Sequence, residues 1–265
     1  MKTASPNAIT YTNYLAKKWE DYEIMDNFGI QQIFKDFHKI AQFDNILSPA
    51  FLLIDYTKRK YLNCSNGIKR LLGYDVKEVL EGGPDFLNQL CQKDYFKVFN
   101  EEIFPKNLAV LACESQIWHK NLTFCFNAQF KNKEGIWNNL LLKTNYITST
   151  NVGLPIFGLV MLINIDGFKN SNIITYTVEK ASRLTGVSSI AEKEYFYPFE
   201  EDKLLTKQEK NILMYMAEGL SSKMIADKLC ISENTVSNHR QNIIRKTNTN
   251  NVAQLIAFAV RNGVI

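Results

Sequence analysis

The chain has 265 residues, of which 46% are hydrophobic and 22% charged, so it can bury one or two ordinary globular cores and lacks the composition of a disordered protein. Its net charge of +4 is too small to indicate a nucleic-acid partner by itself. The charge is uneven, however, because the segment from Lys203 to the end holds 9 basic and 4 acidic residues, whereas the residues before it hold 22 and 23.

Residues 1–47 are expected to form amphipathic helices that flank the first domain. Apolar side chains recur at intervals of three and four residues over 14–22 and again over 33–41, and Gly29 separates the two patterns.

Residues 48–166 change from strands to helices and back to strands. Two short strands are expected over 51–63, and short helical patterns follow them. From Leu122 onward, apolar and polar side chains alternate, and turns divide the segment into three hairpin-linked strands. The pattern predicts an α+β domain in which helices cover one face of a five-stranded antiparallel sheet.

This stretch resembles a PAS domain over about 45% of the chain. The residues that carry the resemblance are Asn66, the run Leu71-Leu72-Gly73-Tyr74, Asp94, the hairpin from Lys133 to Trp137 and the final run from Gly158 to Ile165. The resemblance implies a PAS-like sensor or dimerisation domain.

Residues 167–202 are expected to be a linker. The stretch 192–202 contains five acidic residues and one basic residue, directly before the basic final quarter of the chain. A solvated linker fits this composition, and so does a segment that docks against the basic domain and competes with DNA.

Residues 203–265 contain four helix patterns separated by short turns. Thr206 and Glu209 match a capping box for the first helix, and Ser221 can cap the second. A three-residue turn then leads to a third helix that Ser232 can cap. This arrangement predicts an all-α four-helix domain with a helix-turn-helix layout.

The third helix is expected to present a polar face. At about 100° per residue, Val236, Ile243 and Thr247 fall on the apolar side. The opposite stripe contains no acidic residue and consists of Asn234, Ser237, Asn238, Gln241 and Arg245. Amide side chains can read adenine, and Arg can bind phosphate or guanine, so this face suits a DNA groove. Any surface helix has a polar stripe, and the face alone therefore decides little.

The order of residues is more specific. From Leu205 to Lys246 the chain resembles the LuxR-type helix-turn-helix domain nearly position for position, including the pairs Ile225-Ala226, Thr235-Val236 and His239-Arg240. The resemblance implies that the third helix enters the major groove of double-stranded DNA, with base contacts from Ser237, Asn238 and Gln241. It also implies contacts near the DNA backbone from Lys223, Asn234, Thr235, Arg245 and Lys246.

The chain departs from this pattern at two positions. Ser237 replaces a frequent Lys, which leaves the target sequence open, and Thr247 replaces a common Leu, which is expected to soften the core slightly.

The fourth helix places Val252, Leu255, Ile256 and Ala259 on one face. Its counterpart in LuxR-type domains often pairs two DNA-binding domains, so the resemblance implies a homodimer through this face. Part of the face must also pack within its own domain.

The sequence gives no support for an enzyme, a metal site or a membrane span. Five cysteines without a C-x-x-C pair argue against a disulfide framework and a thiolate zinc site. His38, His119 and His239 have no second ligand at metal-binding spacing, and no catalytic motif occurs. The N-terminus lacks a signal peptide, and the longest uncharged apolar run, 152–165, is too short to cross a bilayer, so a cytoplasmic bacterial protein is expected.

These patterns predict a DNA-binding transcription regulator whose PAS-like domain senses a ligand or partner and controls how the helix-turn-helix is presented. One alternative is a PAS-like domain that serves only for protein interaction or dimerisation and binds no small molecule. An acyl-homoserine-lactone receptor fits less well, because the strand order is PAS-like. The identity of a cofactor or ligand stays open, although a pocket lined by Phe124, Phe126, Trp137, Phe157 and Met161 is one hypothesis and core packing explains the same residues.

Overall fold

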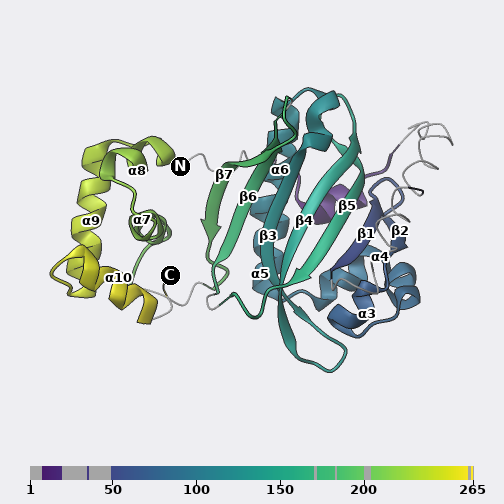
Figure 1. Cartoon of the computed structure of the whole chain (residues 1–265), viewed down its shortest axis with the longest axis horizontal. Helices are drawn as coiled ribbons and strands as arrows, with labels where there is room; N and C mark the ends of the chain where they lie inside the picture. Colours follow the sequence, from purple (N-terminus) through teal and green to yellow (C-terminus); the bar gives the residue numbers. More distant parts are fainter. Residues whose placement is uncertain are drawn as a thin grey trace. The chain divides into compact units, whose positions relative to one another are not determined.

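The computed structural model of the chain forms two compact units (Figure 1). The first contains residues up to 169 together with 174–196, and the second contains 170–173 and the residues from 197 onward. The structure describes residues 8–19, 35, 49–169, 172–182, 184–199, 204–261 and 264.

The first unit is built on one antiparallel sheet with the strand order β2-β1-β5-β4-β3-β6-β7. Its strands are β1 (Ala50–Asp55), β2 (Lys60–Cys64), β3 (Leu122–Lys131), β4 (Trp137–Ser149), β5 (Pro155–Asn164), β6 (Ile174–Ala181) and β7 (Ser188–Phe196). The expected α+β class is confirmed, and β1 to β5 are the five strands that the sequence predicts.

Helices connect β2 to β3, and α5 and α6 lie behind the sheet in Figure 1. In chain order the helical segments are α1 (Tyr11–Ala16), α3 (Gly67–Leu72), α4 (Val76–Leu90), α5 (Lys93–Val98), the π-helix η1 (Phe99–Ile103), α6 (Phe104–Cys113) and the 3-10 helix η2 (Gln116–Asn121). Alternation along β3 places Leu122, Phe124 and Phe126 in the buried core. Within residues 1–47, where two flanking helices are expected, the structure describes only residues 8–19, which include α1, and residue 35. The second expected helix therefore lies outside the described residues.

The expectation of a linker over 167–202 is wrong for residues 174–196. These residues form the β6–β7 hairpin, which extends the sheet beyond β3 and gives it seven strands rather than five. The reason is an alternating apolar pattern, since Ile174, Tyr176 and Val178 are at most 1% exposed. The acidic residues 200–202 lie outside the described residues.

The second unit has the four helices that the sequence predicts: α7 (Lys207–Ala217), α8 (Ser222–Leu229), α9 (Glu233–Thr247) and α10 (Val252–Arg261). The expected caps of α7, α8 and α9 are all present, because Thr206, Ser221 and Ser232 each accept a hydrogen bond from a backbone N–H of the first turn. Cys230 is the C-cap residue of α8, and its positive φ of 53° turns the chain toward α9. Within the described residues, no helix is both long and apolar enough to cross a membrane.

Candidate nucleic-acid interface and internal cavity

Helix α9 presents a polar surface to solvent. Asn234, Asn238 and Gln241 are exposed along it, and the side chains of Thr235 and Ser237 are half-buried. On the opposite side of the helix, Val236, Ile243 and Thr247 are buried, as their spacing predicts. The structure therefore brings the predicted base-contacting residues onto one accessible face.

A hydrogen bond fixes α9 against α8. The guanidinium Nη1 of Arg240 donates to the hydroxyl of Ser222 at 2.8 Å, between the third and the second helix of the domain. At the start of α9, the hydroxyls of Ser232 and Thr235 lie 2.8 Å apart. Thr235 thus belongs to the cap of α9 as well as to its N-terminal surface.

The cations at the end of α9 differ in their surroundings. Arg245 is exposed, and its Nη2 donates to Asn242 on the same helix at 3.0 Å. Lys246 instead contacts Glu209 of α7, with 2.7 Å between Nζ and Oε2. The Glu209 side chain is 4% exposed and that of Lys246 is 35% exposed. The ion pair therefore links α7 to α9, and its acidic partner is almost fully buried.

Glu209 is ionised despite its burial. Burial raises the pKa of this carboxyl, but hydrogen bonds from Lys246 and from the Thr206 backbone N–H outweigh that effect and hold the pKa below its usual value. The side chain of Lys246, which the sequence assigns to the DNA backbone, is consequently already engaged within the domain.

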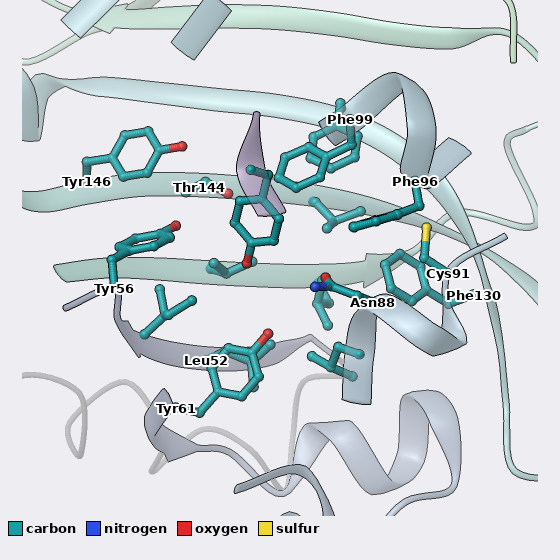
Figure 2. Close-up of a pocket in the computed structure, with 17 residues that line it drawn as sticks. Leu52, Tyr56, Tyr61, Asn88, Cys91, Phe96, Phe99, Phe130, Thr144 and Tyr146 are labelled. Atoms are coloured by element: carbon teal, nitrogen blue, oxygen red, sulfur yellow. The ribbon is translucent and has the colours of Figure 1, made fainter. Parts of the chain in front are cut away.

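The first unit contains a cavity between the sheet and the helices (Figure 2). Its volume is about 70 Å³, whereas one water needs about 10–15 Å³ on the same measure. The space is therefore large enough for several waters or for one organic molecule smaller than benzene, which occupies a cavity of about 150 Å³. The described residues that line it include no charged side chain and no histidine.

The walls of the cavity are mainly aromatic and aliphatic. Phe96, Phe130 and Cys91 line one end in Figure 2, and the hydroxyl groups of Tyr56 and Tyr146 point inward from the other. Burial raises the pKa of the Cys91 thiol to about 12, so it stays protonated.

The phenols of the cavity also stay neutral. Burial is the main reason that the pKa values of Tyr56, Tyr61 and Tyr146 lie well above the usual value. These phenols supply hydrogen-bonding hydroxyls without charge. Asn88 adds an amide, and Thr144 adds an aliphatic hydroxyl.

Helix α1 and the π-helix close part of the cavity wall. Tyr11 of α1 lines the cavity, and its ring lies 4.8 Å from that of Phe99 in η1. The backbone N–H and the hydroxyl of Thr12 both donate to Asn100 Oδ1, at 2.8 and 2.9 Å. Helix α1, which ends 34 positions before β1 begins, thus contributes to the same site.

Residues 203–259 match the family described as bacterial regulatory proteins, luxR family. The C-terminal unit is a LuxR-type helix-turn-helix domain. The match agrees with the order of α7 to α10, their caps and the three-residue turn before α9.

Curated relatives are similar to the chain over this LuxR-type domain. They include an uncharacterized transcriptional regulatory protein YxjL of Bacillus subtilis, 43% identical over 60 residues, which are 23% of this chain and 28% of the relative. DegU of Brevibacillus brevis is 40% identical over 72 residues, which are 27% of this chain and 29% of DegU. The chain therefore spans less than a third of the length of these relatives.

Solved structures with similarity to the chain include the GerE transcription factor, 38% identical, which covers 23% of this chain and 91% of GerE with a TM-score of 0.23. A phage VqmA–DPO complex is 13% identical and covers 88% of this chain and 89% of VqmA with a TM-score of 0.37. A PAS domain from a two-component sensor histidine kinase is 14% identical and covers 50% of this chain and 99% of that domain with a TM-score of 0.34. In this chain, the antiparallel sheet with helices between β2 and β3 gives the first unit the expected PAS-like layout.

The expected dimer face of the LuxR-type domain is corrected by the packing of α10. Leu255 and Ala259 are both 0% exposed, so they belong to the core of their own domain and cannot contact a second copy. Val252 is 36% exposed and Ile256 is half-buried, while Val260, which the sequence reasoning did not select, is 61% exposed. The spacing of four residues between Leu255 and Ala259 reflects packing within the domain.

Only Phe126 of the five suggested pocket residues lines the cavity. Phe157 and Met161 project from the other face of the sheet, because they alternate with Gly158 and Val160. Phe124 packs beside the cavity against Tyr146, with 5.2 Å between ring centroids.

The fifth suggested residue, Trp137, is 46% exposed at the start of β4. Sequence reasoning missed the tyrosines of the cavity, because they come from α1, from the residue after β1, from β2 and from β4, and no spacing rule brings them together.

The two histidines in the described part of the chain are buried or half-buried within the fold. His119 is 1% exposed, and its ring nitrogens bond to Ser149 Oγ and to the Glu114 carbonyl, the latter at 3.0 Å. His239 is half-buried on α9, and His38 lies outside the described residues. No group of three or more His, Cys, Asp or Glu side chains that could hold a metal ion occurs in the described part of the chain.

Proposed function

We propose that the protein is a transcription regulator that binds double-stranded DNA through α9 and responds to a small neutral molecule in the cavity of its PAS-like unit. The observation that carries the first half is the accessible polar face of α9 within a LuxR-type domain. The second half follows from a cavity whose described lining residues are all uncharged.

The roles of the α9 residues follow from their chemistry and exposure. Gln241 and Asn238 can each form a pair of hydrogen bonds with an adenine edge, and Ser237 can bond to more than one base. These three residues would therefore carry sequence discrimination.

Cationic and capping residues would position the domain on the DNA backbone. Lys223 and Arg245 are exposed cations, and Asn234 and Thr235 lie at the N-terminal end of α9, where the helix dipole and its N–H groups favour phosphate. Lys246 would add a weaker contact, since its ammonium group is bound to Glu209 and has hydrogens left for a phosphate.

A homodimer would read two half-sites with a fixed spacing. The exposed side of α10, with Val252, Ile256 and Val260, supports this proposal as a contact surface on the domain. Sedimentation with and without operator DNA tests it, and a monomer under both conditions contradicts it.

The DNA-binding proposal is tested after recovery of operator sequences by genome-wide pulldown of bound DNA. Gln241→Ala should lose about 1–3 kcal/mol of discrimination at one base position. Lys223→Ala should instead weaken binding to specific and random DNA alike and reduce the salt slope by about 1. Lys77→Ala serves as a charge-matched control, because Lys77 is an exposed lysine of α4 in the other unit. Identical behaviour of the first two variants on both kinds of DNA contradicts the assignment of roles.

The alternative to ligand sensing is a PAS-like unit that only binds protein. Two neighbouring substitutions separate these functions, because Val160 lines the cavity and Leu159 projects from the opposite face of the sheet. Val160→Phe should fill the cavity and abolish co-purification of a small molecule seen by native mass spectrometry, whereas Leu159→Phe should retain it. A ligand-free wild type whose DNA binding is unchanged by Val160→Phe supports the interaction module instead.

A further inference from the structure

A buried hydrogen-bonded chain connects the cavity to the β6–β7 hairpin. The Asn107 amide Nδ2 donates to the Tyr146 hydroxyl at 3.1 Å, and the Tyr176 hydroxyl donates to Asn107 Oδ1 at 3.0 Å. The three residues come from α6, β4 and β6 and are at most 2% exposed. One end of the chain faces the cavity, and the other end lies on the hairpin that precedes the LuxR-type domain in sequence.

The hydrogen bonds run in one direction. Tyr146 stays protonated in its buried position, and its oxygen accepts from Asn107. The Tyr56 hydroxyl also hydrogen-bonds to Tyr146 and, like Asn107, lowers its pKa, as a donor to the Tyr146 oxygen does. With both groups donating to this oxygen, the single hydrogen of Tyr146 is left for an acceptor in the cavity, toward which the hydroxyl points (Figure 2).

The Asn107 amide has a second orientation that keeps both hydrogen bonds. A half-turn of the amide exchanges Oδ1 and Nδ2, so Tyr146 would donate to Asn107 and Tyr176 would accept from it. The hydrogen of Tyr176 would then turn toward β7, whose Glu192 and Glu194 are near enough that, after burial, their charges help raise the pKa of this phenol. A hydrogen-bond acceptor in the cavity favours the first orientation, and an apolar cavity favours the second.

The hairpin is held to the same helix by charged contacts on either side of this chain. Lys106 of α6 forms an ion pair with Glu194 of β7, and Glu114, the C-cap residue of α6, forms one with Lys180 of β6. Reorientation of Asn107 therefore changes a polar contact at the interface between α6 and the two strands of the hairpin.

From this geometry we infer that Asn107 couples the cavity to the β6–β7 hairpin, and that the ligand is a neutral molecule presenting a hydrogen-bond acceptor to Tyr146. The inference rests on the proposed sensing function and specifies its ligand class and the residue that transmits binding.

Two probes of nearly equal shape test it on the full-length protein. Acetone has a carbonyl acceptor and no donor, and isobutene replaces that oxygen with a methylene group; each has four non-hydrogen atoms, which suits a cavity of about 70 Å³. NMR titration should show that acetone binds about five-fold more tightly, the effect of one neutral hydrogen bond. Hydrogen exchange read by mass spectrometry should show slower exchange of the β6 and β7 amides with acetone only.

Variants separate the coupling from simple binding. Tyr176→Phe leaves the cavity wall intact, so acetone should still bind while the exchange of the hairpin no longer responds. Asn107→Leu should have the same effect, and Tyr146→Phe should also abolish the preference for acetone. Tyr61→Phe is the matched control, because it removes a cavity phenol outside the chain and should preserve both the preference and the response.

The outcomes distinguish this inference from the proposed function. Equal binding of both probes, or a full hairpin response in Tyr176→Phe, overturns the inference while the cavity still binds small molecules. Binding of neither probe overturns the acceptor assignment, and the Val160→Phe and Leu159→Phe pair then decides separately whether the cavity senses a ligand.

If Tyr176→Phe or Asn107→Leu fails to fold, a comparison without ligand still tests the coupling. Tyr146→Phe removes only the hydroxyl on the cavity side, and it should change the exchange of the β6 amides by itself. Unchanged exchange of β6 in this variant overturns the coupling.

Discussion

The pair of Glu209 and Lys246 leads to a prediction that separates folding from DNA contact. Lys246→Met keeps the length of the side chain and removes its charge, so a carboxylate with a 4% exposed side chain loses its 2.7 Å ion pair. The backbone N–H of Thr206 remains as a donor to Glu209 at 2.8 Å.

The expected loss follows from the burial of the acid. A hydrogen bond to a charged group contributes about 1.5–3 kcal/mol to stability. Because the Lys246 side chain is 35% exposed and water screens the pair, we expect a loss in the lower half of this range, at about 2 kcal/mol. For a domain of this size, that corresponds to a decrease in Tm of roughly 8–16 °C for the transition of the LuxR-type domain. Urea unfolding followed by circular dichroism measures the same loss as a lower midpoint at an unchanged slope.

The pH dependence has a defined sign. The pKa of Glu209 is lowered in the folded protein, so the stabilisation by the pair is complete above the usual pKa of 4.5 and is lost as the pH falls through the folded value. In Lys246→Met, burial becomes the dominant effect and raises the pKa of Glu209. The variant should therefore gain stability relative to wild type as the pH falls from 7 toward 4.5.

Arg245→Met is the matched control, since Arg245 is an exposed neighbouring cation without a buried acid partner. It should weaken DNA binding and leave the unfolding midpoint within about 0.5 kcal/mol of wild type. Combining Glu209→Gln with Lys246→Met should recover part of the lost stability. If Lys246→Met unfolds like wild type and loses DNA affinity as Arg245→Met does, Lys246 is a phosphate contact and the reasoning from burial is refuted.

Three further substitutions test the packing around the two sites. Leu255→Ala should destabilise the LuxR-type domain by about 2–5 kcal/mol in urea unfolding, whereas Val260→Ala on the exposed side of α10 should have little effect on a monomer, and similar losses in both would contradict the assigned faces. Ser232→Ala removes the cap of α9 and should lower the midpoint by about 1 kcal/mol, with Ser232→Thr retaining most of the stability. Gly153→Ala should lower the Tm of the PAS-like unit, because the residue has a φ of 83° and a new Cβ would lie 2.7 Å from the Ala112 backbone nitrogen; an unchanged Tm would contradict this contact.

Local signals were sufficient for the LuxR-type domain. Thr206, Ser221 and Ser232 cap the helices that they were expected to cap, because a hydroxyl placed before a helix acts on its own first turn. Thr247 was expected to soften the core, yet its hydroxyl donates to the Ile243 carbonyl at 2.8 Å, so the polar group is satisfied where it is buried.

Long-range contacts decided what the sequence could not predict. Lys246 and Glu209 are 37 residues apart, and nothing in either helix pattern indicates that one neutralises the other. The cavity tyrosines likewise come together only through long-range packing, because they come from α1, from the residue after β1, from β2 and from β4. Residues 174–178 alternate apolar and polar side chains, but their pairing with β3 depends on long-range contacts that this local pattern does not reveal.

The β6–β7 hairpin determines where the chain can be divided. A fragment that ends at residue 166 would leave Leu122–Phe126 of β3 without the partners that β6 supplies. It would also expose the backbone groups of a long, apolar strand in the centre of the sheet, which is a template for aggregation. An isolated PAS-like unit should therefore extend through Phe196, because a shorter fragment would present β3 as an edge strand, which it is not in the native sheet.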